Sequence, residues 1–266
     1  MKKTRLYLLL FLIVLVVFSC KKDNEEDDTN KATGQINLHF RHHVDGNELD
    51  IDTLIYFNEA GNQYLINEIQ YFISDLTLYH SHAEELIIDS WKDTHYVDTD
   101  LPSTHLWEIP DEIPAGSYDS VSFTFGISQE KNQSFMFVNP PESFMFWPEY
   151  LGGGYHYMKL NGKWLNQDQI IEPFDFHLGI GQILDTAGQI IGFVHNEFDV
   201  GFPDLGFDIS DNQILDLNLT MNIERWFKDP HTYDHDVWGG YIMQNQEAMK
   251  IASDNGRNVF EMEVVR

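Results

Sequence analysis

Apolar and polar residues alternate along most of the chain from Gly34 onward. In the stretch GQINLHFRHHVDG, Ile36, Leu38 and Phe40 share one face with His42, and polar side chains dominate the other face. Successive side chains of a β-strand point to opposite faces, so this period of two predicts a half-buried strand. The same alternation recurs in the runs SVSFTFGIS, ILDLNLTMNIERW and NVFEMEVV.

Turn signals separate these runs, at Asp45-Gly46, Ala60-Gly61-Asn62, Ala115-Gly116 and Asn161-Gly162. One helix is predicted in QNQEAMKIASDNG, where Asn245 can cap the first turn and Gly256 can end the helix. Short strands with regular turns and few helices are typical of an antiparallel sandwich. We therefore expect one all-β domain over residues 34–266, an antiparallel β-sandwich with long loops and one short helix near the C-terminus.

The N-terminal segment has a different character. Three basic residues precede an apolar run from Leu6 to Phe18. Such a run matches a secretory signal and is short for a membrane-spanning helix. It ends in VFSC, which resembles a bacterial lipobox, and Cys20 is the only cysteine of the sequence. We therefore expect residues 1–19 to be a lipoprotein signal peptide and Cys20 to carry the lipid. An ordinary signal peptide with an accidental cysteine is the alternative.

Residues 20–33 are expected to form an acidic tether, because the charged stretch KKDNEEDDTN contains no apolar residue that could pack. An acidic run directly after the cysteine resembles the surface-export signal of Bacteroidetes lipoproteins. We therefore expect a lipoprotein of the cell envelope, held in the outer membrane by its lipid anchor alone and facing either the periplasm or the cell surface.

The chain is strongly acidic, with 16 Lys and Arg against 43 Asp and Glu and a formal net charge of −27. This balance argues against nucleic acid as a partner, because phosphate contacts rely on clustered Lys and Arg. Cations or basic proteins fit better. The sequence has neither a GxSxG nucleophile motif nor a phosphate-binding GxxxxGKS/T loop. We therefore expect a binding protein and not an enzyme.

The twelve histidines give the more specific signal. His42 and His156 lie on the apolar faces of their runs, so both are expected to point inward. His177 lies opposite the apolar positions of PFDFHLGIG, but the glycines that follow it leave room beside its ring. A buried histidine needs partners for its ring nitrogens, or a metal, and neutral imidazoles suit copper, zinc, iron or nickel. A satisfied core histidine is the competing interpretation at each position. His231 and His235, in DPHTYDHD, form a weaker candidate pair.

Five stretches, in this order, resemble those of the MbnP-like copper-binding family, and together they span about residues 34–265. They are LHFRHHVDG, NEIQYFISDLTLY, IPAGSYDSVSFTFGIS, MFW followed by GYHYMKLNG, and FHLGIG with the terminal ASDNGRNVFEMEVV. The resemblance implies a secreted all-β protein that binds copper through histidines. It also implies a partner, a dihaem cytochrome c peroxidase-like protein, that oxidises a tryptophan to kynurenine.

Individual residues follow from this resemblance. His42 matches the histidine of the opening strand, His177 that of the H-x-G motif, and Trp147 the first tryptophan of the Trp-rich run. Many members read MFWTWNSGY where this chain reads MFWPEYLGGGY, with one tryptophan and two extra residues. His156 falls where many members have an apolar residue. We therefore expect a three-histidine copper site of His42, His156 and His177, with Trp147 as a nearby ligand precursor or redox partner.

A different class of function stays open from the sequence alone. Tryptophans expected in exposed loops would suit ring stacking on a ligand. The chain would then be a surface module that binds glycans or another protein without metal, and the tryptophans concerned are Trp91, Trp107 and Trp238.

Overall fold

The structure is a computed structural model that describes residues 32–81, 85–88 and 94–266. Residues from Ala32 to Arg266 group into one compact unit. The predicted signal peptide, the predicted lipidation site Cys20, the predicted tether as far as Lys31, and Trp91 lie outside the described residues. Among the helices of the described part, none has the length and apolar character that crossing a membrane requires.

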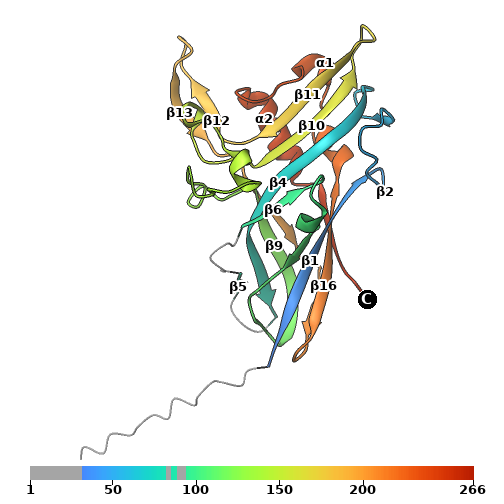
Figure 1. Cartoon of the computed structure of the whole chain (residues 1–266), viewed down its shortest axis with the longest axis vertical. Coiled ribbons are helices and arrows are strands. Elements are labelled where there is room, and N and C mark those ends of the chain that lie inside the picture. The colour runs from blue at the N-terminus through green and yellow to red at the C-terminus, as the bar shows by residue number, and fades with distance from the viewer. Residues whose placement is uncertain (1–31, 82–84, 89–93) are drawn as a thin grey trace, which may run out of the picture. The chain divides into compact units, whose positions relative to one another are not determined.

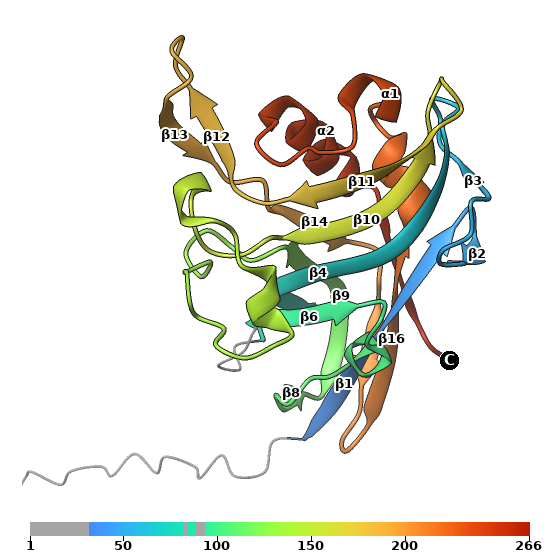
Figure 2. The same ribbon diagram turned by 45° about the horizontal axis from the view of Figure 1, so that its top comes forward.

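The larger sheet lies at the centre of Figure 1 and Figure 2 and, within the described residues, contains nine strands. They are β3 (Tyr56–Phe57), β4 (Gln63–His80), β5 (Glu85–Ile87), β6 (Thr94–Asp98), β9 (Gly116–Phe125), β10 (Met158–Leu165), β11 (Ile171–Leu178), β14 (Phe198–Phe202) and β15 (Phe207–Ile209). The main order is β11-β10-β4-β9-β14, and all these pairings are antiparallel.

The second sheet packs against the first. Its strands are β1 (Thr33–Val44), β2 (Asn47–Glu48), β7 (Leu106–Glu108), β8 (Ile113–Pro114), β16 (Ile214–Asn222) and β17 (Phe260–Val264). β1 and β16 run parallel, and this one pair departs from the expected antiparallel arrangement. Parallel neighbours need a long crossover connection. The chain between β1 and β16 is long enough for this, because it includes every strand of the larger sheet. A separate hairpin joins β12 (Gly181–Leu184) to β13 (Ile190–Val194).

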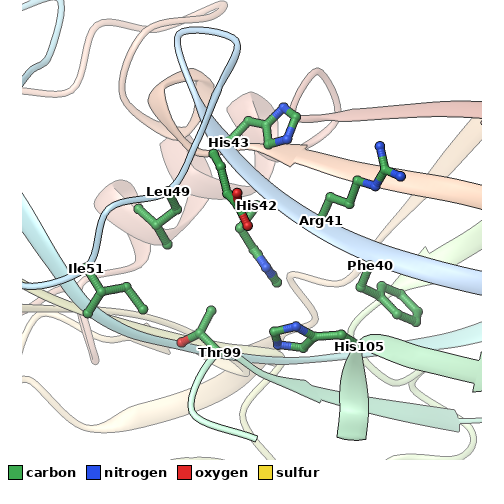
Figure 3. A pocket seen from close by; sticks show the side chains of 9 residues that line it. Phe40, Arg41, His42, His43, Leu49, Ile51, Thr99 and His105 are labelled. Carbon is green, nitrogen blue, oxygen red and sulfur yellow. The ribbon is translucent and has the colours of Figure 1, made fainter. Parts of the chain in front are cut away.

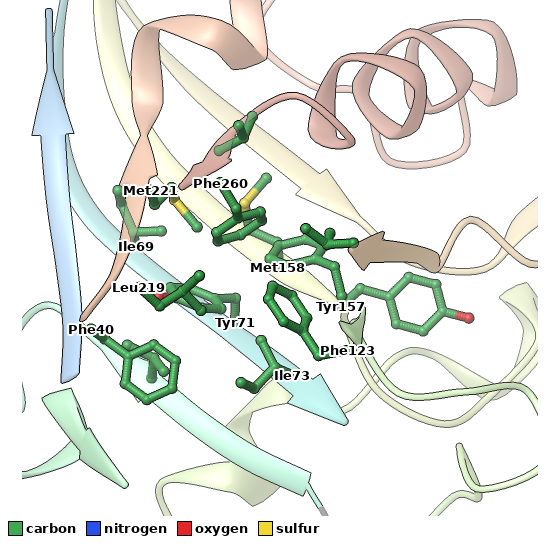
Figure 4. Packing of buried hydrophobic residues seen from close by; sticks show 14 of the residues in the cluster. Phe40, Ile69, Tyr71, Ile73, Phe123, Tyr157, Met158, Leu219, Met221 and Phe260 are labelled. Carbon is green, nitrogen blue, oxygen red and sulfur yellow. The ribbon is translucent and has the colours of Figure 1, made fainter. Parts of the chain in front are cut away.

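The hydrophobic core fills the space between the two sheets, as the alternating pattern predicted. Ile36, Leu38 and Phe40 of β1 are 1%, 1% and 3% exposed. Figure 4 shows Phe40 in the cluster that includes Tyr71 of β4 and Phe123 of β9. The all-β sandwich predicted from the sequence is therefore confirmed.

The two α-helices of the described residues are short and lie near the C-terminus. The predicted helix is α2 (Gln246–Gly256), and the Asn245 side chain caps it by accepting a hydrogen bond from the Ala248 amide. One further turn, α1 (His235–Trp238), falls where a loop was expected. The 3-10 helices are η1 (Pro102–His105), η2 (Glu142–Met145), η3 (Glu149–Leu151) and η4 (Ile223–Phe227).

The predicted turn at Asn161-Gly162 is wrong. Both residues lie inside β10, at a bulge where the register with β4 shifts. A Cβ atom at position 162 would lie 2.3 Å from the Leu65 carbonyl oxygen and 2.4 Å from Cζ of Phe174. The glycine is therefore required by close packing across the sheet, a role that glycine in a strand often has.

Candidate metal centre

His156 and His177 come together at one end of the β10–β11 pair. His156 lies two residues before Met158, the first residue of β10, and Met158 pairs with Leu178 in β11. The two rings have centroids 5.2 Å apart and are nearly perpendicular, at 84°. His156 is 6% exposed and His177 is partly buried. The pairing of two adjacent strands therefore joins two of the three predicted ligands.

One nitrogen of each ring makes a hydrogen bond to a protein oxygen. Nδ1 of His156 donates to the Met145 carbonyl oxygen at 2.9 Å. Nε2 of His177 donates to Oδ1 of Asn161 at 2.8 Å, and the Asn161 amide nitrogen donates in turn to Glu68. Nδ1 of His177 makes no hydrogen bond within the described part of the chain, and the backbone of Phe146 is a second hydrogen-bonding group at the His156 ring. This arrangement is typical of metal-binding histidines, whose second nitrogen is usually held by a carbonyl or carboxylate group.

Both imidazoles are neutral at physiological pH. Burial lowers the pKa of His156 well below its ordinary value, and the nearby His177 and Lys159 lower it further, while backbone groups of Met145 and Phe146 oppose the shift. Burial, with Lys159, also lowers the pKa of His177 to about 4. A neutral imidazole offers a lone pair, so no proton must be displaced before a metal binds.

The spacing of the two rings fits one shared ion. A metal–nitrogen bond is about 2 Å, and about 1.1 Å separates a ring nitrogen from its ring centroid, so a tetrahedral angle at the ion places the centroids about 5.1 Å apart. The observed 5.2 Å matches this value. The donor set, two neutral imidazole nitrogens with secured tautomers, is suited to copper or zinc.

Trp147 lies directly against this pair. Its ring centroid is 4.6 Å from that of His156, and its side chain is fully buried. Nε1 of the indole donates to the Leu151 carbonyl oxygen at 3.2 Å. A Cβ atom at Gly179 would lie 2.6 Å from the indole carbons. The glycine two residues after His177 therefore makes the space that the tryptophan occupies.

His42 lies elsewhere. It is 7% exposed, as its place on the apolar face of β1 predicted, and burial, together with His105 and His43, lowers its pKa to about 3. Its ring contacts Tyr71 and His105, and no ring contact or hydrogen bond joins it to His156 or His177 in the described residues. Over residues 32–81, 85–88 and 94–266, no group of three or more His, Cys, Asp or Glu side chains is placed to hold a metal ion.

His105 is the residue that sequence reasoning missed. It ends η1, a 3-10 helix without buried residues, so no periodic pattern marks its ring as facing inward. Its ring centroid lies 5.5 Å from that of His42. The contact is made by tertiary packing, and no local motif signals it.

The weaker pair, His231 and His235, does not meet. His231 is exposed and its Nε2 lies 3.1 Å from Asp254, whereas His235 is fully buried among aromatic rings. The expectation of exposed tryptophans is wrong for Trp107, which is 7% exposed and stacks on His95 at 5.1 Å. Trp238 is partly buried and stacks on Tyr233.

The fold and the histidines define a class: an all-β, two-sheet protein with paired neutral imidazoles beside a buried indole. The sequence profile of the MbnP family matches residues 33–249, so this chain belongs to the MbnP family, as its ordered motifs indicated. The solved structure of MbnP from Methylosinus trichosporium is similar, with a TM-score of 0.57 and 14% sequence identity over 88% of this chain and 99% of that chain. At this identity the likeness shows a shared fold. A search of curated proteins finds no match.

Proposed function

We propose that this protein binds copper in the cell envelope, as a binding protein and not as an enzyme. The observation that carries the proposal is the pairing of His156 and His177, whose ring centroids lie 5.2 Å apart and whose rings are oriented by hydrogen bonds to Met145 and Asn161. Neutral imidazole is a ligand that copper favours. The proposal also rests on the resemblance of the sequence motifs to those of MbnP-like copper-binding proteins.

The ligands in this proposal are Nε2 of His156 and Nδ1 of His177. The Met145 carbonyl and Asn161 fix the tautomers and orient the rings. Since no hydrogen bond or ring contact of the described residues joins His42 to either ring, a third ligand from this residue requires a rearrangement on binding. We propose the two-histidine pair as the core of the site, and His42→Ala tests whether the third predicted ligand takes part.

The test is a measured copper-to-protein ratio after gel filtration of residues 32–266, the compact unit. The double variant His156→Ala/His177→Ala is expected to lose the copper that the pair holds. His231→Ala is the matched control, because the His231 ring is exposed and its ion-pair partner is Asp254, not a residue of the pair. Unchanged tight binding in the double variant contradicts the proposal.

Trp147 is proposed as the residue that a dihaem cytochrome c peroxidase-like partner oxidises. Its neighbours three residues away on either side, Phe144 and Tyr150, are 67% and 68% exposed. Exposed aromatic side chains are common at protein interfaces, so this face suits a protein that approaches Trp147. Conversion to kynurenine removes one carbon and adds one oxygen, and intact-mass analysis of protein from native cells detects it. An unmodified mass in that protein excludes the modification.

Attachment of lipid to Cys20 and placement in the outer membrane complete the proposal. They rest on the signal-like N-terminal run and the VFSC sequence. Mass spectrometry of the N-terminal peptide from a membrane fraction tests both. An N-terminal peptide without a lipidated cysteine contradicts the anchor.

A further inference from the structure

A second pair of histidines lies apart from the first, where β1 passes η1. His42 and His105 have ring centroids 5.5 Å apart, with an angle of 58° between the rings. Figure 3 shows both rings turned toward the same space, with Thr99 beside them. They line a pocket of about 440 Å³ to which Arg41, Glu48 and Thr99 also contribute.

The hydrogen bonds of this pair repeat the pattern of the first. Nε2 of His105 donates to the Asp98 carbonyl oxygen at 2.9 Å. Nε2 of His42 lies 3.3 Å from the hydroxyl of Tyr71, which is itself buried in the core. Nδ1 of each ring makes no hydrogen bond within the described residues. A carbonyl or hydroxyl group on one nitrogen is what orients a histidine for metal binding through the other.

Arg41, the basic residue of the pocket, is not placed to repel a cation beside the two imidazoles. Arg41 follows Phe40 in β1 and points to the opposite face of the strand from His42, as Figure 3 shows. Its guanidinium lies 3.7 Å from Glu263 of β17, an acidic partner on that face. Glu48, from β2, adds a carboxylate to the pocket wall. Glu48 pairs with His43 in the register of β1 and β2, so its carboxylate must turn to reach the space in front of the two neutral imidazoles.

We propose that His42 and His105 form a second metal site, which binds one first-row divalent ion, zinc or copper, through their Nδ1 atoms. With metal–nitrogen bonds of about 2 Å, the ring spacing corresponds to a nitrogen–metal–nitrogen angle of about 125°, within the range that these ions accept. Glu48 or water takes the remaining positions, because the described residues offer no third histidine, cysteine or acidic side chain already in place. The site opens to solvent through its pocket.

The second site goes beyond the proposed copper binding at His156 and His177, and its ligands are different residues on different strands. Among the described residues, no hydrogen bond or ring contact joins the two pairs directly. Two independent sites predict that their stoichiometries add. Loss of one pair then leaves binding at the other unchanged.

The experiment is a calorimetric titration of the full compact unit with zinc and, separately, with copper. Wild-type protein is expected to bind a second equivalent of at least one of these ions. His105→Ala removes that equivalent, while His156→Ala/His177→Ala retains it. Because His105 is partly exposed, this variant is expected to fold, and a matching thermal unfolding curve verifies that it has.

A second variant tests the geometry without removing a ligand. Tyr71→Phe deletes the hydroxyl beside Nε2 of His42 and leaves the core ring in place. Loss of such an orienting partner typically weakens metal affinity about 10- to 100-fold. That loss is expected at the second site only.

Nitrogen chemical shifts of the histidine rings give a direct readout. Metal addition is expected to shift Nδ1 of His42 and of His105. If neither ion shifts these nitrogens, or if His105→Ala keeps the full stoichiometry of the wild type, the second site is refuted. Either result leaves the proposal for His156 and His177 standing. Conversely, loss of one equivalent in His156→Ala/His177→Ala with metal-induced shifts retained at His42 and His105 supports two separate sites.

Discussion

Acid destabilisation by His235 is the prediction that the structure defines most fully. The His235 ring is fully buried and stacks on Phe174, with centroids 4.5 Å apart, and on Trp164, at 5.5 Å. Neither ring nitrogen has a hydrogen-bond partner in the described structure. Burial lowers the pKa of His235 to about 3, although Asp234 opposes the shift. The perturbation is His235→Phe, which keeps an aromatic ring and removes the titration.

The sign follows from the lowered pKa. Below pH 6.5 the unfolded chain takes up a proton on this residue that the folded protein cannot hold until the pH approaches about 3. Stability is therefore complete above pH 6.5 and is lost as the pH falls. With about 1.36 kcal/mol per pH unit, this single group lowers the free energy of unfolding by about 2 kcal/mol between pH 7 and pH 5.

The assay is urea denaturation followed by tryptophan fluorescence at pH 7, 6 and 5. Wild type loses stability through every buried histidine, so the quantity compared is the difference between variant and wild type. His235→Phe is expected to lose about 2 kcal/mol less than wild type over this range. His231→Phe, at an exposed position, is the control. If wild type and His235→Phe lose the same free energy of unfolding between pH 7 and pH 5, His235 is not a source of the acid destabilisation. A constant packing cost of the phenylalanine ring does not affect this comparison.

Three further predictions concern the proposed copper site. Gly179→Ala places a Cβ atom 2.6 Å from the Trp147 ring, so overpacking is expected to cost about 1–3 kcal/mol in the free energy of unfolding, measured by urea denaturation. Asn161→Ala removes the acceptor of the His177 ring and is expected to weaken copper affinity about 10-fold or more in competition titrations; an unchanged affinity contradicts its orienting role. Copper binding should persist to lower pH than for a free imidazole, because the pKa of His177 is about 4 and protons compete only near that value. Loss of copper near pH 6 contradicts this.

The fold was predictable because alternation acts locally. The inward face of β1, from Ile36 to His42, is specified by side-chain periodicity within one strand, and the structure confirms it. The position of Gly162 was not predictable from its neighbours. The signal Asn-Gly is the same in a turn and in a bulge, and the close approach of the Leu65 carbonyl comes from another strand.

For the candidate site, the sequence likewise predicted which residues are buried but not which residues they contact. Periodicity correctly assigned His42 and His156 to buried faces. It does not say which side chain a buried ring will meet, since that depends on how the sheets pack. The His156 ring contacts the His177 ring because β10 and β11 are neighbours in the chain and pair with each other. The His42 ring contacts His105, which lies in a 3-10 helix without a periodic pattern of buried residues.

We propose that copper is held by His156 and His177. An anomalous-difference map at the copper absorption edge, from crystals of the copper-loaded protein, tests it most directly. Binding by this pair predicts a peak about 2 Å from both Nε2 of His156 and Nδ1 of His177. A copper-loaded crystal with no peak between these two nitrogens contradicts it.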